Sequence, residues 1–534
     1  MADSKTKSSP QRRRFLKQSL STVLGVGFLS HASRSPAIAS TPASAPPVPD
    51  IESLPPLHLT SPLTKSPSRS IADHFESIKS SGDHVALYKF LYALPKGGDI
   101  HHHLGGGFLA RRWYAIATDQ RRNGGQTFYT RCRISRPVEF PLPAPLNRPH
   151  LHFWLTLNQA EFDKLSSDQK TDFKPLQDLD DDEREAWISS VKLDRPGEGR
   201  DEFFEYIWGR LNNLLFSIHV CSELVVENMQ LLGAEGVRYL ELMTFYSLWR
   251  DEKGTILPAS VADQFWRHRL AQPDARATGV LVKFKAVILR FAPDAIERAE
   301  QHFVHIDANR DLWVGVDMAG REDDNRGYPR RFTEVFDRML RKYPEINISI
   351  HAGEAEKADR NIFESLRLGA HRIGHAINLL HDEQTMQMMR NNRHLLEINL
   401  VSNHLLGYVP DPALHPFPIY LRQGIPCCLN TDDRGMWDSN MTDEYFLAVS
   451  QFNLSWTELV QLARNSIEHA FISQSERATI SRSYESALET FANSYTRFDP
   501  PSLLESTPAE TYGYGRKHLG LARLARTLPH SGSL

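Results

Sequence analysis

Short runs of β-branched or otherwise apolar residues alternate with longer amphipathic stretches over most of the chain. Such alternation is typical of βαβ units, in which strands of a parallel sheet are joined by helices. The runs predict strands at Gly98–His101, Val237–Leu242, Val282–Leu289, Trp313–Met318, Ile346–Ile350, Arg372–Gly374, Leu395–Ile398 and Ile425–Leu429. A closed (β/α)8 TIM barrel has this number of strands, although a doubly wound open sheet shows the same pattern. We therefore expect an α/β fold and favour the barrel.

A long insertion interrupts the alternation after the first strand. The chain runs from about Phe108 to Gly236 before the second strand begins, which is far longer than an ordinary βα connection. Its acidic middle, Leu165 to Arg200, lacks periodicity, whereas apolar residues recur at helical spacing from Phe203 to Leu232. We place the insertion at about 125–202. The aromatic residues of the helix that follows are expected to pack on the barrel or, alternatively, to form a lid over the site.

The N-terminal segment, residues 1–39, has the three parts of an export signal. A basic head, Arg12-Arg13-Arg14, precedes an apolar stretch from about Leu20 to Leu29 and an Ala37-Ile38-Ala39 cleavage pattern. The sequence from Arg12 to Lys17 also resembles the bacterial twin-arginine signal. The apolar stretch is too short to span a bilayer, so no stable membrane insertion is expected after cleavage. We expect an exported protein, periplasmic or secreted; the alternative is a disordered basic tail.

The rest of the chain divides into three parts. Residues 40–70 are rich in proline and serine and are interpreted as a linker, residues 71–499 as the barrel with its insertion, and residues 500–534 as a C-terminal extension. Lys and Arg number 62 against 65 Asp and Glu, and this net charge of -3 gives no bulk attraction to nucleic acid. The four cysteines form no Cys-x-x-Cys pair, so neither a thiolate zinc site nor a redox dithiol is expected.

Candidate chemistry lies where the predicted strands end. His101 and His103 are two residues apart at the end of the first strand, so both can face the barrel axis while His102 faces away. Later strand ends add further polar side chains: His351, Glu354, His375, Asp432 and Asp433. Active sites of barrels assemble at the carboxyl ends of the strands. Imidazole nitrogens with one carboxylate suit zinc that keeps a position open for water, so this group indicates metal-assisted hydrolysis.

Further segments extend this set, in order, from about residue 90 to about 490. They are Pro95-Lys96 to His103, Val314 to Gly320 with Glu322, His351 to Glu354, Arg372 to His375, Glu397 through Ser402-Asn403, His415-Pro416, Leu429 to Asp433, Glu444-Tyr445, and Leu462 to Ile467 with Phe471. The set resembles the adenosine deaminase family, and the Lys-Gly-Gly spacing to the first histidine resembles its secreted, growth-factor-related branch. The resemblance implies a zinc-dependent hydrolase that converts adenosine or a related 6-aminopurine nucleoside to the 6-oxo product and ammonia.

The resemblance also implies a role for each site residue. One zinc ion per chain would be held by His101, His103, His351 and Asp432. Glu354 would protonate N1 of the purine, and His375 would orient the zinc-bound hydroxide and act as general base or as an electrostatic stabiliser. Asp433 would hydrogen-bond N7, and the backbone amide of Gly320 would meet N3. Glu397 and Ser402 would support the metal ligands from behind.

One departure from the family concerns the sugar. The family has an acidic residue near the ribose after the His-x-His, whereas this chain has Leu104-Gly105-Gly106. The missing carboxylate is expected to alter recognition of the ribose hydroxyls, for which the acidic insertion is a candidate replacement.

Two other functions are alternatives: a different metal-dependent amidohydrolase on the same barrel, and a relative that binds nucleoside with weak turnover or none. A small-molecule purine nucleoside is the expected partner. The N-terminal segment and the insertion are candidate contact surfaces for a homodimer.

Overall fold

The structure is a computed structural model that describes residues 69–135, 153–323, 327–497 and 500–524. The predicted export signal, 1–39, lies outside the described residues, as does the predicted linker, 40–70, except for its last two residues. Both therefore stay predictions. Among the described helices, none is both long enough and apolar enough to cross a bilayer.

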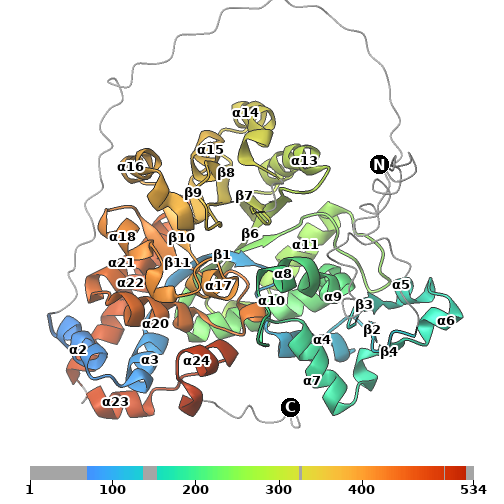
Figure 1. Ribbon diagram of the computed structural model, residues 1–534, viewed down its shortest axis with the longest axis horizontal. Helices are drawn as coiled ribbons and strands as arrows, with labels where there is room; N and C mark the ends of the chain where they lie inside the picture. The colour runs from blue at the N-terminus through green and yellow to red at the C-terminus, as the bar shows by residue number, and fades with distance from the viewer. Residues whose placement is uncertain (1–68, 136–152, 324–326, 498–499, 525–534) are drawn as a thin grey trace, which may run out of the picture. The chain divides into compact units, whose positions relative to one another are not determined.

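Eight parallel strands form one sheet at the centre of the molecule (Figure 1). In sheet order they are β1 (Gly97–His103), β5 (Val237–Thr244), β6 (Leu281–Leu289), β7 (Trp313–Ala319), β8 (Asn347–Ala352), β9 (Arg372–His375), β10 (Leu395–Ile398) and β11 (Cys427–Leu429). No end of a predicted strand differs from the observed end by more than two residues. The strands read as near-continuous apolar runs because both faces of a parallel sheet are covered.

The first and last strands of this order meet, so the sheet is a nearly closed barrel. The backbone N–H of His103 donates to the carbonyl of Asp432 (3.1 Å), and the N–H of Asp432 donates to the carbonyl of His101 (3.0 Å). His102 and Asp432 form a parallel bridge at the same point. The TIM-barrel prediction is confirmed, and the open-sheet alternative is wrong.

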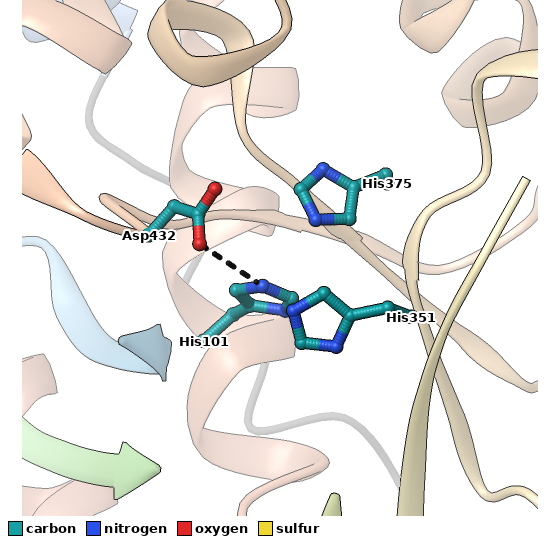
Figure 2. A group of neighbouring side chains, drawn as sticks. All are labelled: His101, His351, His375 and Asp432. Atoms are coloured by element: carbon teal, nitrogen blue, oxygen red, sulfur yellow. Dashed lines mark ion pairs between the residues drawn. The ribbon is translucent and has the colours of Figure 1, made fainter. Parts of the chain in front are cut away.

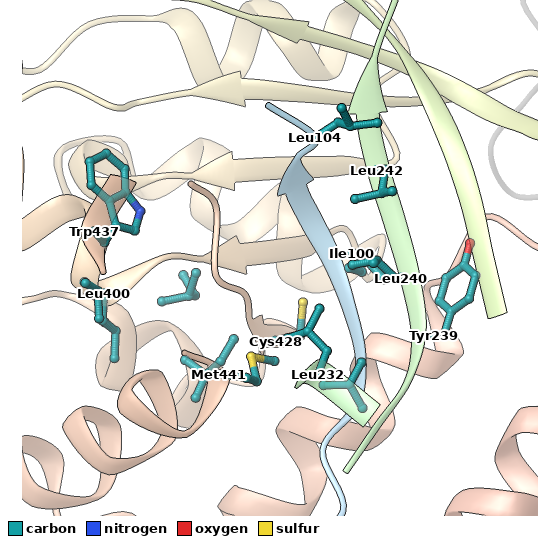
Figure 3. Close-up of a cluster of buried hydrophobic side chains, with 14 of the residues drawn as sticks. Ile100, Leu104, Leu232, Tyr239, Leu240, Leu242, Leu400, Cys428, Trp437 and Met441 are labelled. Carbon is teal, nitrogen blue, oxygen red and sulfur yellow. The ribbon is translucent and has the colours of Figure 1, made fainter. Parts of the chain in front are cut away.

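Helices surround the barrel and bury its outer surface (Figure 1). They are α2 (Arg69–Ser80), α3 (His84–Ala93), α4 (Ala110–Thr118), α10 (Ile218–Ala234), α11 (Ala259–Leu270), α12 (Pro273–Ala277), α13 (Ala295–Ala308), α14 (Thr333–Lys342), α15 (Asn361–Arg367), α16 (Glu383–Asn391), α17 (Leu400–Leu405), α18 (Phe417–Arg422), α19 (Arg434–Trp437), α20 (Met441–Phe452), α21 (Trp456–Glu468) and α22 (Gln474–Arg497). Figure 3 shows part of the buried core, where Ile100, Leu242 and Cys428 lie on β1, β5 and β11. All four cysteines are free thiols.

The insertion between α4 and α10 forms a small three-stranded antiparallel sheet and several short helices. The sheet has the order β3 (Thr156–Asn158), β2 (Phe128–Arg131), β4 (Phe173–Pro175). The acidic run that lacked periodicity begins α7 (Asp181–Ser190), with Asp180 and Glu183 forming a capping box at its N-terminus. Carboxylates in the first turn of a helix stabilise it, because they interact favourably with the positive end of the helix dipole. These acidic residues therefore have a local structural role.

The prediction of one helix from Phe203 to Leu232 is wrong. This stretch contains α8 (Arg200–Glu202), a π-helical turn η5 (Phe203–Ile207), α9 (Trp208–Leu211) and a 3-10 turn η6 (Asn212–Phe216) before α10 begins. Asn212 has a φ of 36°, and Ser217 is extended and accepts a hydrogen bond from the N–H of Val220. An N-cap serine starts a new helix, which explains why the apolar spacing continues across a break in the backbone.

The C-terminal extension continues with α23 (Pro500–Ser506) and α24 (Gly513–His518). Tyr514 of α24 is buried, and its hydroxyl lies 2.9 Å from Nδ1 of His404 on α17. This part of the extension therefore packs against the barrel.

Lys96, just before β1, joins two helix ends to the barrel. Its buried ammonium donates to the carbonyls of Leu91, Tyr92 and Leu94 (2.6, 3.2 and 3.1 Å) at the end of α3 and of Glu235 (2.6 Å) at the end of α10. Cations stabilise helix C-termini, whose last carbonyls lack partners within the helix.

We expect Lys96→Met to lower the free energy of unfolding by about 3 kcal/mol, because several buried carbonyls would lose a charged donor. Chemical denaturation measures the change. Lys89→Met is a matched control, since the half-buried Lys89 also donates to two carbonyls, those of Leu504 and Glu505. Equal losses from the two variants would contradict the role given to Lys96.

Candidate active site

Polar side chains from four strand ends converge inside the carboxyl end of the barrel (Figure 2). The ligand atoms of His101, His351, His375 and Asp432 all lie within 4.8 Å of one another. His103 joins this group, with its Nε2 3.1 Å from Nε2 of His351 and 3.3 Å from Oδ1 of Asp432. The structure thus brings together all four predicted metal ligands and one predicted catalytic residue.

Two of the histidines are oriented by buried carboxylates. Nδ1 of His101 lies 2.6 Å from Glu397, and Nδ1 of His351 lies 2.8 Å from Asp317. A carboxylate can only accept, so each ring carries a proton on Nδ1 and directs its Nε2 toward the centre of the group. Carboxylate–histidine pairs of this kind are typical of metal ligands.

The donor set fits a divalent cation. Nε2 of His101 and Oδ1 of Asp432 are buried, have no hydrogen-bond partner among the described residues and lie 3.5 Å apart. Burial lowers the pKa of His103 to about 3 and also lowers the pKa of His351, which favours the neutral rings that metal ligands must have. Burial opposes a charge on His101, but the carboxylates of Asp432 and Glu397 raise its pKa to about 10, so metal binding would displace a proton from this ring. Burial disfavours the ionised form of Asp432, but the adjacent His101 ring holds the pKa of this carboxyl well below its usual range. Nitrogen donors with one carboxylate favour zinc among the common ions.

The backbone at two strand ends is strained. His375, the last residue of β9, and Ala376 have φ of 66° and 52°, and Asp432 has a φ of 54° after β11. Non-glycine residues in this left-handed region cost about 1 kcal/mol each and persist only where the surrounding structure holds them. Here the strain turns an imidazole and a carboxylate toward the same point.

Glu354 is buried, and its backbone is fixed by the carboxylate of Glu322. The carboxylate of Glu322 accepts hydrogen bonds from the backbone N–H groups of Gly353 and Glu354, both at 3.1 Å, and from Nδ2 of Asn361 at 2.7 Å. Burial, followed by the negative charges of Asp432 and Glu322, raises the pKa of Glu354 well above its ordinary value. This shift favours the protonated form of Glu354, which is the form that can act as a general acid.

Asp433 is a second buried carboxyl next to the predicted metal ligands. Burial and the adjacent Asp432 raise the pKa of Asp433 well above its ordinary value, which favours its protonated form, and its Oδ1 has no hydrogen-bond partner among the described residues. A Cβ atom on Gly106 would lie 1.6 Å from that oxygen, so only glycine fits there. The glycines after the first strand thus leave room for a carboxyl that can donate a hydrogen bond.

The remaining predicted residues differ in what they contact. Glu397 connects His101 to Arg372, whose Nε lies 2.6 Å from its other oxygen. Gly320 directly follows β7 and has a φ of 115°, a backbone conformation that favours glycine. Ser402 lies on α17, and its buried hydroxyl has no hydrogen-bond partner among the described residues.

Several residues of the site were not assigned roles from the sequence. They are Asp317, Glu322, Asn403 and His415, all of which belong to the segments that resemble the family. Asp317 carries the clearest signal, because a carboxylate inside the apolar run of β7 needs a charged or hydrogen-bonding partner. For the others the spacing along the chain gives no indication of the contact.

The insertion contacts the loops that carry the site. A Cβ atom on Gly105 would lie 2.6 Å from Leu215 and 3.1 Å from Trp208, so these side chains occupy the space beside Gly105. Ion pairs also join the insertion to the barrel loops. Arg200 of the insertion pairs with Asp323 and Glu356 of the barrel at 2.7 and 2.6 Å. In the opposite sense, Arg321 of the barrel pairs with Asp201 of the insertion at 2.7 Å. The insertion therefore both packs on the barrel and borders the site.

Comparisons with known proteins point to one family. The profile of the adenosine deaminase family matches residues 174–485. An adenosine deaminase from Vibrio parahaemolyticus is 33% identical over 269 residues, which are 50% of this chain and 77% of the relative. An adenine deaminase from Chelativorans is 30% identical over 250 residues, 47% of this chain and 74% of the relative.

A solved structure shares the fold. An amidohydrolase from Burkholderia ambifaria, determined with bound Zn, has a TM-score of 0.53 and 18% identity, covering 77% of this chain and 95% of its own. At this identity the likeness shows the barrel fold alone.

We expect Asp317→Asn to weaken metal binding by about 10- to 100-fold, because His351 loses the anionic acceptor that orients it. Metal retained after dialysis against graded chelator measures the affinity. Asp311→Asn is the control, since Asp311 pairs with Arg267 at the surface. An affinity unchanged by Asp317→Asn would contradict the assignment of His351 as a ligand.

Proposed function

Because the chain belongs to the adenosine deaminase family and is a deaminase hydrolase, we propose that it deaminates adenosine or a related 6-aminopurine nucleoside in a zinc-dependent reaction. Water replaces the exocyclic amine at C6, giving the 6-oxo purine and ammonia. The observation that carries the proposal is the buried carboxyl of Glu354 beside a set of three histidines and one carboxylate that fits a single metal ion.

The chain's own residues supply the positioning. His101, His103, His351 and Asp432 hold the zinc ion, which when bound lowers the pKa of water and polarises it for attack. Glu354 donates its proton to N1 of the purine, which makes C6 more electrophilic. N7 has only a lone pair, so Asp433 binds it as the neutral acid that its raised pKa maintains. The N–H of Gly320 meets N3, and Glu397 keeps His101 in position.

The sugar end of the substrate meets the insertion. Trp208 and Leu215 occupy the space beside Gly105, where the family has a carboxylate. An apolar wall at this point favours an uncharged nucleoside and reduces recognition of ribose hydroxyls. Free adenine is therefore a second candidate substrate, which the relative named as an adenine deaminase also supports.

We also propose that the protein works outside the cytoplasm and belongs to the secreted, growth-factor-related branch. The support is the sequence of residues 12–17, the cleavage pattern at residues 37–39 and the Lys96-Gly97-Gly98 spacing before His101. Detection of the mature chain in the periplasm or medium, starting near residue 40, tests this assignment. A homodimer through the insertion is the oligomeric state to examine in the same preparation.

We expect ammonia release from adenosine, 2′-deoxyadenosine or adenine by the metal-replete full chain. Glu354→Gln should lower kcat by about 100-fold or more, because the amide cannot protonate N1, while one zinc per chain is retained. Glu356→Gln is the matched control two residues away, where the carboxylate pairs with Arg200. Inactivity of the parent chain on all three purines would refute the substrate class, and formation of acid or amide products instead would favour another amidohydrolase.

The pH dependence follows from the raised pKa of Glu354. The protonated acid is the active form, so kcat/KM should be maintained at neutral pH and fall as pH rises through that raised pKa. The bound cation lowers this pKa again, which moves the alkaline limb toward neutrality without changing its sign. A kcat/KM that continued to rise with increasing pH would contradict the assignment of Glu354 as the acid.

A further inference from the structure

Two buried side chains, those of His415 and Asn403, connect a backbone amide to His375. The N–H of Phe417, at the start of α18, donates to Nδ1 of His415 at 3.1 Å. Nε2 of His415 lies 3.0 Å from Oδ1 of Asn403, and Nδ2 of Asn403 lies 3.0 Å from Nδ1 of His375. His415, Asn403 and His375 are each at most 3% exposed, so water does not compete for these contacts.

The backbone amide sets the direction of every hydrogen bond in this chain. An N–H can only donate, so Nδ1 of His415 has no proton and the neutral ring carries its proton on Nε2. That proton is donated to Oδ1 of Asn403, which fixes the orientation of the amide. The NH2 group of Asn403 then donates to Nδ1 of His375. His375 is left with its single proton on Nε2.

The hydrogen bonds themselves favour neutral rings, because a histidine whose Nδ1 accepts a hydrogen bond carries its single proton on Nε2. For His415, burial also lowers the pKa to about 3.

Nε2 of His375 faces the reacting centre. It lies 3.8 Å from Oε1 of Glu354, and the ring centroid is 5.0 Å from that of His101 and 5.2 Å from that of His351. Figure 2 shows the ring across the group from His101 and His351. Asn399 also contacts the ring, with its Nδ2 3.2 Å from Nδ1 and 3.4 Å from Nε2.

We propose that Asn403 and His415 are positioning residues that hold His375 as an Nε2–H donor. Two consequences follow for the proposed deamination, on which this inference rests for its function. A protonated Nε2 has no lone pair, so His375 is excluded from the metal and His103 completes the ligand set. His375 would therefore donate a hydrogen bond to the oxygen of the attacking water and would not act as general base. Of the two protons of that water, one leaves with the amine as ammonia, and the other restores the proton that Glu354 gives to N1.

The tautomer can be observed without any activity. In full-length protein with 15N-labelled histidine, two-bond 1H–15N spectra distinguish Nδ1–H from Nε2–H rings, and His375→Gln identifies the signal. We expect His375 to be Nε2–H in both metal-free and zinc-loaded protein. In Asn403→Asp the carboxylate can only accept, so the proton should move to Nδ1 of His375. An Nδ1–H ring in the parent chain would overturn the proposal.

Kinetics then separate positioning from general damage to the fold. Asn403→Asp and His415→Leu should lower kcat by about 10- to 100-fold with KM changed less than threefold, because the substrate contacts are intact. His415→Gln keeps an N–H donor for Asn403 and should restore much of the rate. His404→Gln is the control on the same helix, where the imidazole contacts Tyr514.

Failure of the proposed deamination and failure of the proposed positioning of His375 give different results. If the parent chain deaminates none of the purines, the proposed function fails while the NMR experiment still decides the tautomer. If Asn403→Asp reverses the tautomer but leaves kcat unchanged, the hydrogen bonds through His415 and Asn403 set the tautomer of His375, but their role in the reaction is refuted. Equal losses of kcat in His415→Gln and His415→Leu would show that packing, and not the donated hydrogen bond, is what matters.

Discussion

The closure of the barrel between β11 and β1 is the contact on which the site depends. Two backbone hydrogen bonds join Asp432 to His101 and His103, which lie more than 300 residues away in the chain. They bring the carboxylate of one strand end next to the imidazoles of the other, and the left-handed backbone of Asp432 directs its side chain inward. Without this closure the same residues would lie at opposite edges of an open sheet.

The site also depends on the buried carboxylates of Glu397 and Asp317, which orient His101 and His351. A buried carboxylate is costly unless it is paired, and each of these has a cation. Glu397 pairs with Arg372, which also binds Glu241, and Asp317 pairs with Lys285 at 3.0 Å. The lysine also donates to the carbonyl of Ile100, next to the first metal ligand. The interior of the barrel is therefore a charged network that orients imidazoles, surrounded by an apolar layer between strands and helices.

The insertion shows how an acidic segment can be mostly structural. Asp180 caps a helix, Asp201 pairs with Arg321, and Arg200 binds the carboxylates of two barrel loops. These pairs tie the insertion to the loops that carry Glu322 and Glu354. Trp208 and Leu215 occupy the space beside Gly105. The side chains next to this glycine therefore come from the segment between α4 and α10, and not from the alternating strands and helices of the barrel.

The sequence by itself determined the eight strands and the polar residues at the strand ends, because these follow from local periodicity and from the burial of parallel strands on both faces. It favoured the barrel without excluding an open sheet, and Glu397 was indicated only by the resemblance to the family. The closure of the sheet became visible only in the hydrogen bonds between Asp432 and the end of β1. Only the tertiary structure decided the short strands of the insertion, the break between Ile207 and Ser217, and the chain from His415 through Asn403 to His375. Strands of three residues carry too little pattern to detect, and a capping serine can restart a helix in another direction without disturbing the apolar spacing. The direction of the hydrogen bonds on His375 depends on one backbone amide more than 40 residues away, and such a contact exists only once the chain has folded.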